Sequence, residues 1–279
     1  MFFCRSFCML FIFLFPLVVP VMGGCAATSQ MLIMEEDGKK AQGTDLWMKA
    51  VDLANRNQQW IAGKKKTRFE FQDGDHKIEQ AETVWHESRP AGDGSVTTEL
   101  VRATRNGEDV TEKKVKEEQE RKKRQAQQAD EKESPESVSE EKKVINVSLF
   151  AGHPFLEEHQ KNVLVERMLE KRTLQGKPCV GYKFRLDLGE GAFASGMAWL
   201  EDPTGAPLEV RFTQRPLPPH TKDIITTLRF EHTPEGVWRE IESITESKVG
   251  FLFMTKYIVL TEKRSDFWEK KEKPPPPEK

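Results

Sequence analysis

The chain has 279 residues, with 43 lysines and arginines against 45 aspartates and glutamates, which gives a formal net charge of −2. This near balance gives no support for a nucleic-acid partner or for any strongly charged partner. The four cysteines lie at positions 4, 8, 25 and 179. Because three of them fall within the first 25 residues, no disulfide is expected inside the folded part.

The N-terminus has the layout of an export signal. One basic residue, Arg5, precedes a nearly continuous apolar run from Phe7 to Met22. A transmembrane helix needs about 20 apolar residues, so this run, which contains two prolines, is marginal for spanning and suits a signal peptide. It ends in Val-Met-Gly-Gly-Cys, which resembles the lipobox of bacterial lipoproteins, with Cys25 as the lipid-attachment residue.

We therefore predict a signal peptide over residues 1–24 and a mature chain anchored to a membrane through lipidated Cys25. An uncleaved N-terminal anchor, in which Cys25 is an ordinary small residue, is the alternative. Both interpretations place the rest of the chain outside the cytoplasm.

The amino-acid composition divides the residues after the signal peptide into a tether, a domain with a charged insertion, and a tail. Residues 25–44 are polar and unpatterned, as in a tether, and residues 269–279 form a proline-rich tail. A half-barrel domain is predicted over 45–268, interrupted by a charged insertion at about 106–143. The insertion has hardly any large apolar side chain, so it cannot bury a core; a solvated helix to about Asp130 and disorder beyond are expected. A binding arm or coiled coil is the alternative, although no apolar heptad is present.

The first predicted element is a helix that begins at Asp45, in which Leu46, Ala50 and Leu53 share one face. Gly63 is expected to end the region around this helix. The basic run Lys64–Lys66 is expected to lead into the strands that follow.

The later pattern has period two, which is typical of strands. Phe69 and Phe71 alternate with polar residues, and the turn Asp73-Gly74-Asp75 predicts a hairpin with residues 77–87. Further strands are expected at 96–105, 163–173, 180–188, 197–201, 208–212, 224–232, 237–243 and 251–263. Because successive hairpins in one twisted sheet curl toward closure, we predict a mainly β (α+β) fold. Its architecture is a curved antiparallel sheet or unclosed β-barrel with a helix covering its concave face.

Two stretches carry a family resemblance. Residues 176–184, and residues 197–208 with Trp-Leu-Glu-Asp at 199–202, resemble the Lol-type lipoprotein carrier and receptor superfamily. The resemblance implies an unclosed antiparallel barrel whose apolar interior binds acyl chains or lipoproteins. Together with a lipid anchor, it implies a receptor-like or sensor-like member rather than a free carrier. Ala26, where an aspartate would retain the protein at the inner membrane, implies an outer-membrane location facing the periplasm.

Catalytic chemistry finds little support in the sequence. The six histidines form no metal-ligand spacing, and no nucleophile elbow or phosphate loop is present. We therefore expect no enzyme activity, no metal and no cofactor. Cys179 is expected to be a small buried residue rather than a nucleophile.

The predicted ligand-binding surface is apolar. It comprises Phe69, Phe71, Tyr182, Phe184, Trp199, Phe212, Ile224, Leu228 and Phe230. An acyl chain on this surface would gain about 0.8 kcal/mol per buried methylene. The leading hypothesis is a cell-envelope lipoprotein that binds lipid or the acyl chains of lipoproteins, in a role such as lipoprotein sorting. In the alternative, the aromatic side chains pack on the helix, the barrel is filled, and the protein is a structural or regulatory partner of another envelope protein.

Overall fold

The computed structural model describes residues 44–270, apart from 92–94, 132–152, 236 and 252–253. The predicted signal peptide, Cys25, the tether before Thr44 and the proline-rich tail from residue 271 lie outside the described residues. None of the helices in the described part of the chain is long and apolar enough to cross a membrane.

The elements follow the chain in an order that the sequence pattern largely anticipates. They are α1 (Thr44–Arg56), β1 (Trp60–Gln72), β2 (Ile78–Pro90), β3 (Val96–Arg105), β4 (Glu108–Asp109), α2 (Thr111–Glu131), the 3₁₀ turn η1 (Glu157–His159), β5 (Val163–Leu174), β6 (Lys177–Gly189), β7 (Ala192–Glu201), β8 (Pro207–Arg215), β9 (Thr221–His232), β10 (Trp238–Phe251) and β11 (Met254–Glu269).

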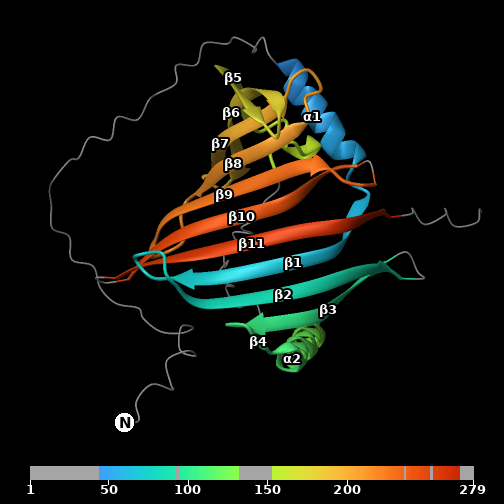
Figure 1. The fold of residues 1–279 in the computed structure, drawn as a ribbon, viewed down its shortest axis with the longest axis vertical. Coiled ribbons are helices and arrows are strands. Elements are labelled where there is room, and N and C mark those ends of the chain that lie inside the picture. Colours follow the sequence, from blue (N-terminus) through green and yellow to red (C-terminus); the bar gives the residue numbers. More distant parts are fainter. Residues whose placement is uncertain (1–43, 92–94, 132–152, 236, 252–253, 271–279) are drawn as a thin grey trace, which may run out of the picture. The chain divides into compact units, whose positions relative to one another are not determined.

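The strands form one antiparallel sheet of 11 strands, in the order β4-β3-β2-β1-β11-β10-β9-β8-β7-β6-β5 (Figure 1). Strand β1 pairs with β11, so strands from the two ends of the domain meet in the interior of the sheet. The strands at the two ends of this order, β4 and β5, are not neighbours, so the sheet is unclosed. The predicted mainly β fold, an unclosed antiparallel sheet with a covering helix, is confirmed.

Helix α1 attaches to the sheet through one aromatic side chain. Trp47 is 2% exposed. Its ring lies 4.8 Å from that of Phe155 and 5.9 Å from that of Tyr182 on β6. Its indole Nε1 donates a hydrogen bond of 2.9 Å to Oε1 of Gln160. Burial of this ring and of Ala50 beside it fixes α1 over the β6–β8 part of the sheet.

The register divides the sheet into two faces, because paired residues share a face and neighbours along a strand alternate. A row of paired residues runs from Tyr182, which contacts Trp47, through Ala198, Val210, Leu228, Ser243 and Glu262 to Thr67 on β1. We call the face that bears this row the helix-covered face.

Helix α2 lies on the same face, at the other end of the sheet. The Nζ of Lys114 lies 2.6 Å from Oε1 of Glu82 on β2, which pairs with Phe69 on the helix-covered face. The backbone N–H of Ala103 on β3 donates to Oγ1 of Thr111 at 2.9 Å. The helix predicted within the charged insertion is therefore present, and its N-terminus is attached to β2 and β3.

Two sequence expectations need correction. Lys64–Lys66 lie inside β1 rather than leading into it. Two of the lysines are tolerated there because β11 offers carboxylates: the Nζ of Lys64 lies 2.6 Å from Oδ2 of Asp266, and the Nζ of Lys65 lies 3.5 Å from Oε1 of Glu262. The bounds of the strand expected at 251–263 are also wrong. Phe251 is the last residue of β10, and the final strand, β11, runs from Met254 to Glu269.

Replacing Trp47 with Ala is expected to lower the free energy of unfolding by about 3–5 kcal/mol, because a large buried ring is lost. Urea unfolding followed by circular dichroism measures this. Met48→Ala on the same helix is the matched control, since Met48 is 45% exposed, and should cost less than about 1 kcal/mol. Equal losses in the two variants would contradict the placement of α1.

Candidate ligand-binding face

The part of the helix-covered face beneath α1 is packed with aromatic and aliphatic side chains. Five residues predicted to line a cavity there are each at most 6% exposed: Tyr182, Phe184, Phe212, Leu228 and Phe230. Gly196 pairs with both Phe184 and Phe212, and a Cβ at position 196 would lie 2.6 Å from Cα of Phe212. The lack of a side chain at Gly196 lets the two phenyl rings approach to 6.4 Å. This part of the face is a filled core.

Trp199 lies on the opposite face, so the expectation that it points toward α1 is wrong. It pairs with Gly181, the neighbour of Tyr182, and alternation therefore turns Trp199 away from the helix. A Cβ at Gly181 would lie 3.0 Å from Cζ3 of Trp199. The guanidinium of Arg172 lies 4.5 Å from its ring centroid and covers it. Strict alternation along β7 could have placed this residue, because the neighbouring Ala198 is the small residue that faces α1.

A cavity of about 80 Å³ lies between the end of α1 and the sheet. Its lining includes Ala54, Asn57, Phe155, Phe230 and Trp238. Small-molecule sites usually measure about 300–1,000 Å³, and one water takes about 30 Å³ of liquid volume. The cavity lies well below this range and is too small for an acyl chain.

Charged groups line the same cavity. Burial and, after it, the nearby Arg239 lower the pKa of His153 to about 4. Burial also raises the pKa of the Glu240 carboxyl, against the opposing effect of the Arg264 guanidinium, with which it forms an ion pair. The Nη1 of Arg239 donates to the backbone oxygen of Asn57 at 2.5 Å, which fixes the end of α1 to the start of β10.

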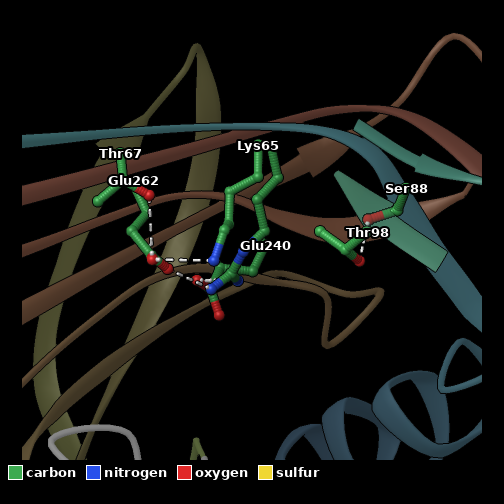
Figure 2. Close-up of polar contacts among 7 residues, drawn as sticks. Lys65, Thr67, Ser88, Thr98, Glu240 and Glu262 are labelled. Atoms are coloured by element: carbon green, nitrogen blue, oxygen red, sulfur yellow. Dashed lines mark hydrogen bonds and ion pairs between the residues drawn. The ribbon is translucent and has the colours of Figure 1, made fainter. Parts of the chain in front are cut away.

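The ion pairs continue along the helix-covered face of β1 and β11 (Figure 2). Nη2 of Arg264 lies 3.0 Å from Oε2 of Glu262, and Nζ of Lys65 lies 3.5 Å from Oε1 of the same carboxylate. Oγ1 of Thr67 donates to Oε1 of Glu262 at 3.4 Å. This network was not predicted from the sequence. Its signal there is the period-two series Lys65, Thr67, Phe69 and Phe71, which places the lysine and the threonine on the same face of β1 as the two phenylalanines.

Apolar side chains reappear on this face beyond the ion pairs. Phe69 pairs with Leu260 and is 37% exposed, although it is a large apolar residue in the sheet interior. Phe71 pairs with Ile258, and both are half-buried. We call Phe69, Phe71, Ile258 and Leu260 the β1–β11 apolar strip. The main helix contacts lie elsewhere, with β7 and β10 for α1 and with β3 for α2.

The strip is continuous with the filled core. The row of Phe184 and Phe212 passes through Thr226 and Thr245 to Leu260 and Phe69. The hydroxyls of Thr226 and Thr245 lie 3.1 Å apart and form a hydrogen bond with each other. These two threonines, which connect the core to the strip, are therefore buried without an unpaired hydroxyl. Ile224, 7% exposed, belongs to the next row, which runs through Ser247 and Ile258 to Phe71. Eight of the nine predicted lining residues therefore share one face: six are buried, Phe71 is half-buried and Phe69 is exposed.

Cys179 is 1% exposed, and its Sγ donates to the backbone oxygen of Lys177 at 3.3 Å. Burial raises the pKa of the thiol, which keeps it protonated and unreactive. This environment is that of the small buried residue predicted from the sequence.

Comparisons with known proteins give limited help. No protein-family model and no curated protein matches the sequence. Among solved structures, the chain is similar to a LolA superfamily protein from Nitrosomonas europaea, with a TM-score of 0.33, 12% identity, and coverage of 82% of this chain and 93% of that one. It is also similar to a proposed outer membrane lipoprotein-sorting protein domain from Vibrio parahaemolyticus, with a TM-score of 0.35, 11% identity, and coverage of 82% and 95%.

A third similar structure is a chain of the Pseudomonas aeruginosa MucA/MucB complex, with a TM-score of 0.23, 9% identity, and coverage of 82% and 100%. At these TM-scores, all below 0.5, the likeness carries no argument about the superfamily or the site of this chain, and the site is judged on its own geometry.

The depressed pKa of His153 predicts acid sensitivity. The unfolded chain takes up a proton near pH 6.5, whereas the folded chain keeps His153 neutral down to about pH 4. Stability is therefore lost as the pH falls through this interval, by about 3 kcal/mol from this residue. The free energy of unfolding of His153→Gln should fall less between pH 7 and pH 4 than that of the unsubstituted chain.

His76→Gln, at an exposed histidine in the turn between β1 and β2, is the matched control for this measurement and should follow the unsubstituted chain. Parallel pH curves for His153→Gln and the unsubstituted chain would show that His153 titrates normally and would contradict the burial argument.

Proposed function

We propose that this protein is a cell-envelope lipoprotein that binds the acyl chains of a lipid or lipoprotein on the β1–β11 apolar strip. The observation that carries the proposal is the exposure of Phe69 on the helix-covered face. A large apolar side chain in the interior of a sheet is normally covered, and an exposed apolar patch marks a binding surface. The filled core beneath α1 anchors the strip but leaves no room for a ligand of its own.

Polar groups beside the strip suit the head of an amphiphile. On the same face, Glu262 lies one row from Phe69, and its ion-pair partners Lys65 and Arg264 lie two rows from Phe69. Lys65 has a 40% exposed side chain, so its ammonium can reach a carboxylate or ester oxygen at the end of an acyl chain. The tail would then lie along Phe69, Leu260, Ile258 and Phe71, where each buried methylene contributes about 0.8 kcal/mol.

The experiment is native mass spectrometry of the full chain carrying Cys25→Ser, so that a covalent lipid on that residue does not contribute. Adducts of lipid mass are expected and should disappear on organic extraction. Phe69→Glu should reduce the adduct fraction about tenfold or more, because an acyl contact would leave the new carboxylate without water.

Leu164→Glu on the edge strand β5 is the matched control. Leu164 is 73% exposed and lies away from the strip, so its variant should keep the adducts. Both variants should retain the unfolding midpoint of the unsubstituted chain. Adducts that persist in folded Phe69→Glu would contradict the site.

A second function is favoured by the filling beneath α1. With a cavity of about 80 Å³ there, the fold also suits a structural or regulatory protein that binds an envelope partner through its surface. This function predicts a bare polypeptide mass for the unsubstituted chain. It also predicts that deletion of residues 117–131 in α2, which leaves the Thr111 and Lys114 attachments, abolishes partner binding; under the first function the deletion leaves lipid adducts unchanged.

A further inference from the structure

The face opposite the helices carries a groove of about 510 Å³ across β2, β1, β11 and β10. Lys66, Trp85 and Lys263 lie in one row of paired residues, and Ile241, Glu242 and Lys64 also line the groove. Lys66 and Lys263 neighbour Thr67 and Glu262 of the helix-covered face, so alternation places them on the other face. The volume falls in the range of about 300–1,000 Å³ that ligand sites occupy.

The carboxylates of the groove are mostly neutralised within the protein. Glu242, with a 12% exposed side chain, lies 2.7 Å from Nη1 of Arg229 and 3.1 Å from Nζ of Lys263. Glu87 lies 2.8 Å from Nη2 of Arg89. Glu231 stands at the far end of the groove, on β9. Lys64 is paired with Asp266, and Nε of Arg102 lies 4.0 Å from Oδ2 of Asp109. Lys66 is therefore the lysine of the β1–β2 end that has no carboxylate partner among the described residues.

The cations at that end surround an indole ring. The Nζ of Lys66 lies 5.3 Å from the ring centroid of Trp85, and the guanidinium carbon of Arg102 lies 5.2 Å from it. Lys66 is exposed and has no ion-pair partner among the described residues. Trp85 and Ile241 are half-buried and give the groove an apolar floor beneath these charges.

We propose that this groove binds an anionic phospholipid, with its phosphate at Lys66 and its first acyl carbons against Trp85 and Ile241. Charge complementarity carries the proposal, because an ammonium without a carboxylate suits a phosphate oxygen. The apolar floor selects a phosphate joined to a hydrocarbon over a free anion. This site lies on the other face of the sheet from the β1–β11 apolar strip and does not depend on acyl binding there.

The test is equilibrium dialysis of dihexanoyl phosphatidylglycerol against the full chain in a neutral detergent. Lys66→Glu is expected to weaken binding about tenfold, and Trp85→Ala to weaken it severalfold. Raising the salt concentration from 0.05 to 0.5 M should also weaken binding, since the phosphate is held near the surface. Phe69→Glu should leave this binding unchanged, which separates the groove from the acyl site.

Lys183→Glu is the matched control, because Lys183 is an exposed lysine on β6 with no ion-pair partner among the described residues. It should bind phosphatidylglycerol as the unsubstituted chain does. Equal affinity in Lys66→Glu and Lys183→Glu would overturn the proposal. Equal affinity for dihexanoyl phosphatidylcholine, or displacement by inorganic phosphate at the same concentration as the lipid, would overturn it as well.

Discussion

One short helix cannot cover a wide sheet, and the arrangement of both faces follows from this limit. Helix α1 has 13 residues, which at about 1.5 Å each make it about 20 Å long. The sheet has 11 strands, which at about 4.8 Å between neighbours extend about 48 Å. The helix therefore covers only part of its face: Trp47 packs on β6, and the helix also contacts β7 and β10. The rest of the face must be polar, covered by α2, or exposed.

The described residues show all three outcomes. The β2–β3 end takes α2 through Glu82 and Lys114. The neighbouring strands β1 and β11 hold the ion pairs of Lys65, Glu262 and Arg264, whose charges compensate one another. Among these regions the strip around Phe69 remains apolar and is only partly covered, with Phe69 exposed and its three neighbours half-buried, which is why the proposed function is assigned there. The aromatic residues beneath α1 contribute stability and position the strip.

Much of the fold could be predicted from the sequence, because period-two alternation in segments such as 180–188 is strong and the turns between them are marked by glycine and proline. The amphipathic pattern from Asp45 likewise predicted α1. Prediction failed where charge concealed a strand. Lys64 and Lys65 are tolerated in β1 because Asp266 and Glu262, at diagonal positions on β11, form ion pairs with them, and one segment alone cannot reveal these pairs. The side of Trp199 was predicted wrongly because the aromatic residue of β7 was expected to face α1, whereas Ala198 faces α1 and Trp199 faces the other side.

The predicted apolar residues divide into a filled core and a partly exposed strip. This division depends on the length of α1 and on strand register, and neither follows from residue type.

The measurement that tests this account most directly is photo-crosslinking with a diazirine-bearing palmitate, using the full chain with Cys25→Ser and mapping the labelled peptides by mass spectrometry. The account predicts labels in residues 67–72 of β1 and 256–262 of β11. Labels concentrated in 180–186 and 208–212 would contradict it, since an acyl chain could reach those residues only if α1 moved away from the sheet.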